Sequence, residues 1–258
     1  MKNLSVIITI LCFFTTKGIS QNVDSLLNLG KELLDRGSIY FDEGSLIEAE
    51  QKFQQILDLS SESYLAQYFL AYTDYRLAVY YRQTKEDEQF NNYISLAENE
   101  LEAILDSNDT NSEVLSLLAS AYGEQITANS DSAIHLAPKA LLLISKALNL
   151  DPDNPRVHLL AGKLLLNLPE KYGGDKQKSL LHLKKSVRLL EANQDADDDL
   201  EWGYIFALTW LGKNYMELND YAAAVDIYNK ALEVSPDFLW IKNILLPEAE
   251  NKLNPNDE

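Results

Sequence analysis

The sequence has a single cysteine, Cys12, which lies close to the N-terminus. The rest of the chain therefore has no thiol for a disulfide or for a cysteine nucleophile. Glycine and proline are also scarce, at 10 and 7 of 258 residues. No stretch alternates polar and apolar residues as a half-buried strand would. These absences exclude a disulfide-held fold and a thiol enzyme, and they predict an all-α chain held together by burial of its apolar side chains.

Positive charge is scarce as well, because 22 lysines and arginines stand against 40 aspartates and glutamates. The resulting net charge of −18 repels the phosphates of nucleic acids and the headgroups of anionic lipids. We therefore expect no nucleic-acid partner and no insertion of the mature chain into a membrane.

Groups that could carry catalysis are few. The three histidines, His135, His158 and His182, fall on different predicted helices, and His158 has no neighbouring serine or carboxylate at helical spacing. Gly173-Gly174 lacks the lysine and hydroxyl residue that follow the glycines of a phosphate-binding loop. We predict no catalytic residue, no metal and no cofactor. An enzyme would need polar groups from distant parts of the chain to converge, which the sequence alone does not test.

Residues 1–20 are typical of a secretory signal peptide. Lys2 supplies a positive start, Val6 to Phe14 is an apolar run, and Gly18-Ile19-Ser20 precedes an expected cleavage before Gln21. The run is short for a membrane span, so a retained anchor is the less favoured alternative. We expect an exported protein, periplasmic in the first place, with secretion from the cell as the second possibility.

The most informative stretch is Leu211 to Pro236, where small residues, aromatic residues and a proline recur at fixed separations. Gly212 and Ala224 are small enough for two antiparallel helices to touch, while Tyr215 and Tyr228 would fill the wider gaps. Asn219-Asp220 supplies a turn and a helix cap, and Pro236 ends the second helix. This pattern closely resembles the tetratricopeptide repeat (TPR), a helix–turn–helix unit of about 34 residues.

The resemblance implies a right-handed α-solenoid of about five helix hairpins and a C-terminal closing helix. We place a repeat domain over residues 21–254, a closing helix at 237–252 and a frayed tail at 255–258. In the first repeat, Gly37 and Phe53 match Gly212 and Tyr228, with a turn at Gly44-Ser45. The expected repeats span roughly 30–61, 62–110, 112–152, 155–191 and 205–236.

TPR proteins act as adaptors that hold a peptide or helix in a concave groove, and the chain also resembles bacterial exported TPR proteins of undefined activity. We therefore predict a non-enzymatic protein–protein interaction scaffold of the bacterial envelope, with a protein partner that the sequence does not identify. The alternative is a small-ligand-binding or substrate-delivery protein associated with an envelope transporter. Self-association is a further possibility, because the ends of solenoids can pack on one another.

Five residues are candidates for the groove: Tyr68, Tyr72, Tyr75, Lys163 and Lys213. The tyrosines, with Tyr64, recur every three or four residues and so share one helical face; they would either line a groove or fill the space within a long hairpin. Each lysine follows a small contact glycine, which places it on the concave side. We expect that exchanging both lysines for glutamate weakens partner binding and leaves helicity intact.

Two further features have mainly structural interpretations. Trp202, Trp210 and Trp240 are expected to pack between the fifth repeat and the closing helix. The acidic segment from Asp195 to Glu201 lacks the glycine and the distant glutamate of an EF-hand. We interpret it as an exposed linker before the next helix, with a calcium site as the alternative.

Overall fold

A computed structural model describes residues 22–192 and 200–254 of the chain. The predicted signal peptide at 1–20, the predicted frayed tail at 255–258 and Asp195 to Asp199 of the acidic segment lie outside the described residues. The interpretation of that segment as linker or calcium site therefore stays a prediction.

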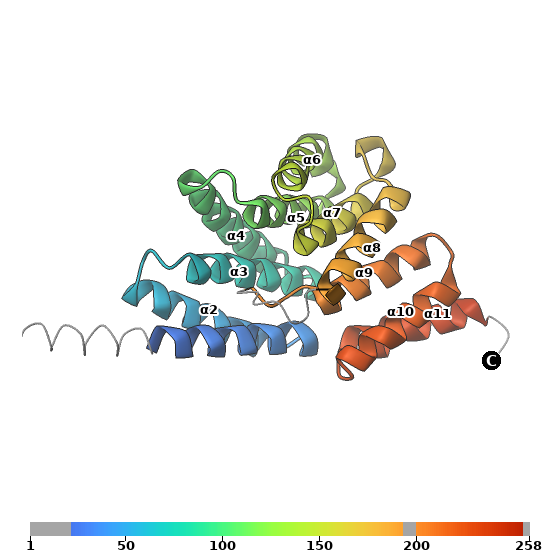
Figure 1. The fold of residues 1–258 in the computed structure, drawn as a ribbon, viewed down its shortest axis with the longest axis horizontal. Coiled ribbons are helices and arrows are strands. Elements are labelled where there is room, and N and C mark those ends of the chain that lie inside the picture. The colour runs from blue at the N-terminus through green and yellow to red at the C-terminus, as the bar shows by residue number, and fades with distance from the viewer. Residues whose placement is uncertain (1–21, 193–199, 255–258) are drawn as a thin grey trace, which may run out of the picture.

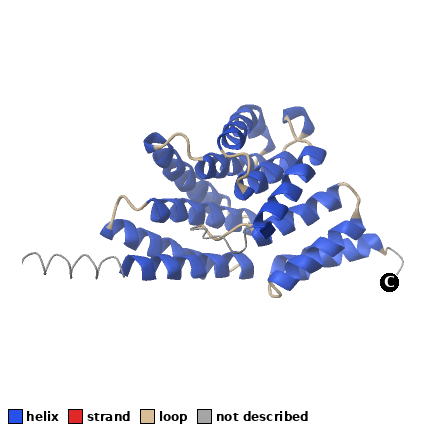
Figure 2. Ribbon diagram, viewed as in Figure 1, coloured by secondary structure: helices blue, strands red, loops and turns tan. Residues whose placement is uncertain are grey.

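The described residues form helices and no strands (Figures 1 and 2). The all-α solenoid of helix hairpins with a closing helix is confirmed. The hairpins pair a helix at 22–40 with α2 (Glu43–Leu59), α3 (Tyr64–Thr84) with α4 (Asp87–Ser107), α5 (Ser112–Ala128) with α6 (Ala133–Leu150), α7 (Pro155–Asn167) with α8 (Lys176–Ala192), and α9 (Tyr204–Glu217) with α10 (Tyr221–Val234). Short 3₁₀ turns lie at Ser130–Ser132 and Glu170–Tyr172, and a π-helical turn, Ile241–Leu245, leads into α11 (Leu246–Leu253).

Polar residues set where several helices begin. The Asn154 side chain accepts hydrogen bonds from the backbone N–H groups of Arg156 and Val157, at 2.9 and 3.0 Å. Asp220 accepts one from the N–H of Ala223 at 3.3 Å. These oxygens satisfy N–H groups that have no partner inside a helix, and the predicted cap at Asn219-Asp220 is confirmed.

Small residues let the paired helices approach closely, as the repeat pattern predicts. A Cβ placed on Gly212 would lie 2.2 Å from the ring of Tyr228, and a Cβ on Gly162 would lie 2.5 Å from Leu183. The first repeat differs from the prediction, because Phe53 packs on Gly30 and not on Gly37, where a Cβ would instead meet Leu46. Two turns of helix separate Gly30 from Gly37, so the predicted match between Gly37 and Gly212 is wrong.

One predicted boundary also changes. The first connection lies at residues 41–42, and α2 has already begun when it reaches Gly44. Helix α5 runs through Gly123 to Ala128. Pro247 lies inside the closing segment, where a π-helical turn precedes it and Pro247 falls in the first turn of α11.

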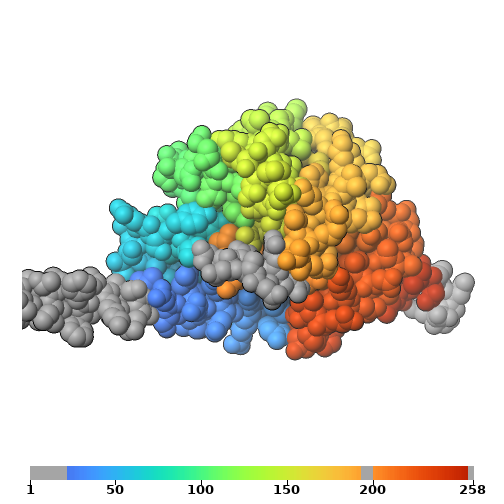
Figure 3. Space-filling model, viewed as in Figure 1, coloured from blue at the N-terminus to red at the C-terminus, as the bar shows by residue number. Residues whose placement is uncertain are grey.

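The stack of hairpins curves so far that its first and last units come together. In Figure 1 the helix at 22–40 and α2 lie along the same edge of the molecule as α10 and α11, with α3 to α8 forming the arc between them. In the space-filling view the same two ends lie next to each other (Figure 3), and residues of both line one pocket. An ion pair joins Lys31 of the first helix to Glu201, just before α9, at 2.6 Å. The solenoid therefore forms a nearly closed arc.

Among the described residues, Ser130–Leu150 is the one helical stretch that is long and apolar enough to cross a membrane by length and composition. In the fold it packs against α5 as the second helix of the third hairpin. Its outer side exposes Ile134 and Leu142. The expectation that the mature chain does not enter a membrane stays a prediction.

Candidate binding pocket between the two ends of the solenoid

A pocket of about 630 Å³ opens where the two ends of the solenoid meet. One wall comes from the first repeat, through the end of the helix at 22–40 and the start of α2. The opposite wall comes from α9 and the closing segment, and α3 forms the floor together with single residues of α5 and α7. Because its walls come from the two ends of the chain, the pocket exists only in the folded arc. We call it the end-to-end pocket.

Aromatic rings dominate the walls, and they come from both ends of the chain. Phe41 and Tyr80 contact each other on one side, with ring centroids 4.5 Å apart. On the other side, Trp210 and Trp240 meet edge to face at 6.2 Å. The aromatic lining residues are Tyr40, Phe41, Tyr80, Phe206, Trp210, Phe238 and Trp240.

A buried ion cluster forms the floor. The Glu124 carboxylate accepts hydrogen bonds from the Lys163 ammonium and from Arg82 Nε, the latter at 2.7 Å. Lys163 also donates to the Tyr75 hydroxyl, which lies 2.9 Å from Ser120 Oγ. Desolvation alone would raise the pKa of Glu124, but the charges of Lys163 and Arg82 outweigh it and lower that pKa to about 2. Glu124 is therefore ionised, and its single charge faces two cations.

Two further cations line the pocket without such a partner. Lys213 Nζ lies over the rings of Trp210 and Trp240, at 4.4 and 4.9 Å from their centroids. The Arg76 guanidinium lies over the ring of Phe206 at 4.5 Å and donates to Ser38 Oγ at 3.1 Å. Desolvation, followed by repulsion from Lys163, lowers the pKa of Lys213 to about 8. Within the described part of the chain, no carboxylate oxygen lies at ion-pair distance from either cation.

The five predicted groove residues fall into two groups. Lys163 and Lys213 line the end-to-end pocket, whereas Tyr68, Tyr72 and Tyr75 do not. The tyrosines are almost fully buried, and Tyr72 stacks on Trp202 with ring centroids 4.4 Å apart. The interpretation of the tyrosines as exposed groove residues is wrong, because the chain fills that part of the concave face itself.

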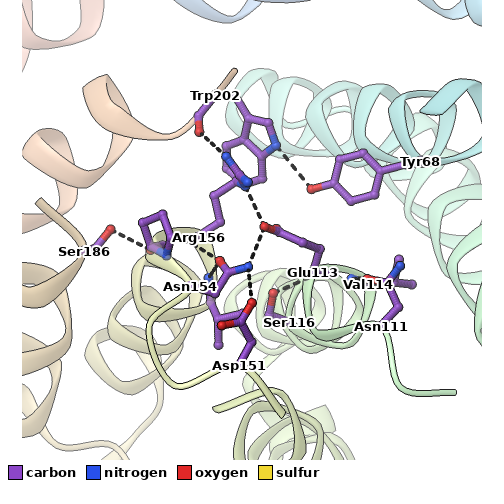
Figure 4. Close-up of polar contacts among 12 residues, drawn as sticks. Tyr68, Asn111, Glu113, Val114, Ser116, Asp151, Asn154, Arg156, Ser186 and Trp202 are labelled. Carbon is purple, nitrogen blue, oxygen red and sulfur yellow. Dashed lines mark hydrogen bonds and ion pairs between the residues drawn. The ribbon is translucent and has the colours of Figure 1, made fainter. Parts of the chain in front are cut away.

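The residues around Trp202 hold this segment in the arc. Trp202 Nε1 donates to the Tyr68 hydroxyl at 3.2 Å, and its carbonyl accepts from Arg156 at 3.3 Å (Figure 4). Arg156 in turn pairs with Glu113 at 2.8 Å, and Asn154 donates to the same carboxylate. Trp202 thus packs against the second unit, contrary to the prediction that all three tryptophans pack between the fifth repeat and the closing helix. Trp210 and Trp240 do make that contact.

The burial of Lys163 also changes the expected effect of the double lysine exchange. Lys163→Glu would place a second carboxylate against Glu124 in a desolvated site, and breaking a buried pair in this way costs about 3–5 kcal/mol. We therefore expect Lys163→Glu to destabilise the fold, so that a loss of binding by the double exchange would not report on the groove alone. Lys213, which is only partly buried, is the lysine that can be exchanged to test binding.

The histidines are less isolated than the sequence indicates. His158 on α7 and His182 on α8 face each other, with their Nδ1 atoms 2.8 Å apart, and His158 Nε2 lies 2.9 Å from the carbonyl of Pro152. Desolvation, with the charge of His158 next, lowers the pKa of His182 to about 4, and desolvation also lowers the pKa of His158. Burial thus favours the uncharged form of each ring. No third metal-ligating side chain joins them among the described residues.

Sequence reasoning missed Arg76, Arg82, Glu124 and the aromatic residues of the first repeat. Arg76 and Arg82 are the two cations of the tyrosine-rich helix α3, and their placement on a helix otherwise rich in apolar residues was a usable signal. No local pattern marks Phe41 or Glu124, because the residues that they contact in the pocket come from other hairpins.

Comparison with known families supports this architecture. Residues 205–238 match the tetratricopeptide repeat family, and the chain as a whole has the TPR α-solenoid fold. A comparison with curated proteins finds no match. The chain thus carries a TPR by sequence in its fifth hairpin and by fold throughout.

Solved structures with the same fold include two of bacterial origin. A thermophilic TPR protein of Thermus thermophilus is similar with a TM-score of 0.62 and 18% identity, covering 90% of this chain and 98% of that one. The HusA haemophore of Porphyromonas gingivalis is similar with a TM-score of 0.57 and 21% identity, covering 78% and 93% of the two chains. At these identities the likeness concerns the fold.

Proposed function

We propose that this chain is a non-enzymatic binding scaffold exported to the bacterial envelope, and that a segment of a partner protein enters the end-to-end pocket. TPR folds serve generally as protein-interaction scaffolds, and the predicted signal peptide supports export. The observation that carries the proposal is the open pocket itself. It offers aromatic walls and two cations that form no ion pair among the described residues, while Trp202 fills the middle of the concave face.

The mouth of the pocket supports a protein partner. Phe41 on one side is 43% exposed, and Ile244 on the other is 56% exposed. Tyr40 and Leu239 beside them are also exposed large apolar residues. Exposed apolar groups that gather in one place, rather than singly, are typical of interaction sites. A bound segment would bury these groups and would join the two ends of the arc.

A second candidate is the delivery of a small ligand, in association with an envelope transporter. The bounded volume of about 630 Å³ favours it, since drug-sized ligands occupy clefts of this order. The likeness to a haemophore of the same fold is consistent with it. The two candidates share the pocket and differ in what occupies it.

Site-specific photo-crosslinking in cells separates the two candidates. A photoreactive amino acid replaces Asn243, which is exposed and lines the pocket. The matched control replaces Gln177, which is exposed on α8 and is outside the lining. A discrete protein adduct from position 243 and none from 177 is the expected result. The absence of any protein adduct at 243 contradicts the scaffold and favours the small-ligand candidate.

Export is tested separately by cell fractionation. The mature chain is expected in the periplasmic fraction, with its N-terminus at Gln21. Recovery of the full-length chain in the cytoplasm would overturn the envelope assignment, whatever the crosslinking shows.

A further inference from the structure

We propose that the end-to-end pocket recognises an organic anion attached to a flat aromatic body, with Lys213 holding the anion and the aromatic walls packing on the body. This inference rests on the proposed function, because it names the chemistry of the group that the same pocket accepts. The group can belong to a partner protein or to a free small molecule, and the chemistry required is the same.

The first argument is the charge balance of the pocket. Four cations line it, Arg76, Arg82, Lys163 and Lys213, against the single carboxylate of Glu124. Glu124 is shared by Lys163 and Arg82. Asp35, which lies outside the lining, interacts with Arg76. The described residues that line the pocket therefore carry a positive surplus, in a protein whose net charge is −18. Removing cations from water without a counter-charge is unfavourable. An anion is therefore the ligand that stabilises this pocket, and a cation is excluded.

The second argument is the position of Lys213. Its ammonium lies over two tryptophan faces, an arrangement in which the ring quadrupoles attract the charge. These contacts leave the ammonium without a direct anionic partner among the described residues. Desolvation and the neighbouring charge of Lys163 already disfavour the charged form of Lys213. An anion placed beside it would attract the charged form of Lys213 and so offset both effects.

The third argument concerns the body of the ligand. The pocket's rings stand on opposite walls, Phe41 with Tyr80 and Trp210 with Trp240. Aromatic pairs gain energy beyond their buried area when the rings stack or meet edge to face. A flat aromatic group between the two walls would contact rings on both sides, which a simple inorganic anion cannot do.

The fourth argument is a strained residue at the mouth. Phe41 has a φ of +55°, a left-handed conformation that is unfavourable for a residue with a side chain. It follows the first helix in a turn closed by the hydrogen bond from Asp42 N to Gly37 O at 3.0 Å. Glycine is the usual residue at such a position. A phenylalanine held there by its surroundings, with its ring on Tyr80, fits a binding role better than a stabilising one.

The test uses three probes with the same ring system. These are 2-naphthoate, 2-naphthyl phosphate and the neutral 2-naphthamide, titrated into the full mature chain by calorimetry and by tryptophan fluorescence. Binding of one or both anions, at least tenfold tighter than the amide, is the expected result. Equal affinity for anion and amide, or no binding of any probe, overturns the proposal.

Variants locate the site. Lys213→Gln is expected to weaken anion binding about tenfold and to leave the weak binding of the amide unchanged. Lys178→Gln removes an exposed lysine of α8 that pairs with Asp175, and it serves as the matched control with unchanged binding. An equal loss of anion affinity in both variants, or no loss of anion affinity in Lys213→Gln, overturns the role of Lys213.

The outcomes also separate this inference from the proposed function. Protein adducts at position 243 without probe binding would leave the scaffold standing and would reject the anion chemistry. Probe binding without protein adducts would support the anion chemistry and assign the pocket to a free small molecule. If a protein segment supplies the anion, adding 2-naphthoate before irradiation is expected to reduce the protein adduct at position 243.

Discussion

Trp202 stacks on Tyr72 with ring centroids 4.4 Å apart and ring planes 22° from parallel. The two residues come from the fifth and second units of the chain, so their contact ties the far parts of the arc together. The indole N–H of Trp202 also donates to Tyr68 at 3.2 Å. In a simple repeat stack each unit contacts only its neighbours, whereas this pair joins units that are not adjacent in the chain.

Replacing Trp202 by alanine is expected to lower the free energy of unfolding by about 3–5 kcal/mol, because a large ring leaves a closely packed interior. Trp202→Phe keeps a ring on Tyr72 and loses the N–H donor, so a smaller loss is expected. Urea titration followed by far-UV circular dichroism measures both. Equal stability of the alanine variant and the natural chain would contradict the tie between the second and fifth units.

A second prediction concerns the helix contact in the fifth hairpin. Gly212→Ala would place a methyl group 2.2 Å from the Tyr228 ring, and such overpacking costs about 1–3 kcal/mol. Gly44→Ala is the control, because its nearest neighbour would lie at an ordinary 3.5 Å inside the first turn of α2. That change should be neutral or stabilise by up to about 1 kcal/mol. Thermal melting of the two variants shows whether close contact, and not glycine as such, is required.

A third prediction follows from Asp74, which is buried between helices. Desolvation, then the charges of Glu100 and Glu50, raise its pKa to about 9, and the pKa of Glu100 is raised to about 7, chiefly by desolvation. The folded pKa of Asp74 exceeds the unfolded value of 3.8, so its contribution to stability is fully present below about pH 4. That contribution falls as the pH rises toward 9.

Asp74→Asn removes this penalty, because a neutral amide replaces a group that resists ionisation. The melting temperature at pH 8 is expected to rise by at least about 2 °C and to depend less on pH between 5 and 9. Asp226→Asn, at an exposed position of α10, changes the net charge equally and serves as control. A gain of the same size in Asp226→Asn would assign the effect to net charge.

A fourth prediction separates stability from binding at Phe41. Phe41→Gly relieves a left-handed residue and loses the ring contact with Tyr80, so the free energy of unfolding should change by less than about 1 kcal/mol. Binding of 2-naphthoate should fall several-fold. Lys85→Gly is the control, because Lys85 also has a positive φ of 64° at the end of α3 and is outside the pocket lining. Unchanged probe binding by Phe41→Gly would remove Phe41 from the site.

The sequence was most informative where the interactions are local. The fifth hairpin, with its Gly212–Tyr228 contact, and the Asp220 cap depend on residues close in sequence, and these predictions hold. The first repeat shows the limit of such matching. Gly30 and Gly37 lie on the same helix two turns apart, and only the packed structure shows which of them meets Phe53.

The pocket could not be predicted in the same way. Its walls approach each other because small rotations between successive hairpins accumulate along the stack. The total rotation cannot be inferred from the sequence of any single repeat. Lys163 and Lys213 were found because they follow contact glycines. Phe41 and Trp240 gave no sign that they would line the same pocket. The tyrosines of α3 were assigned to the wrong surroundings because the segment that covers them, at Trp202, comes from a different unit.

The first repeat and the closing segment line the same pocket. The number of hairpins between them therefore determines whether the pocket can form. Most repeat arrays tolerate the gain or loss of a unit, since each contacts only its neighbours. Here the addition of one hairpin would move Phe41 away from Trp240, and the removal of one would drive the two ends into each other. A chain of this kind is expected to vary in its surface and its loops through evolution while its repeat count stays fixed.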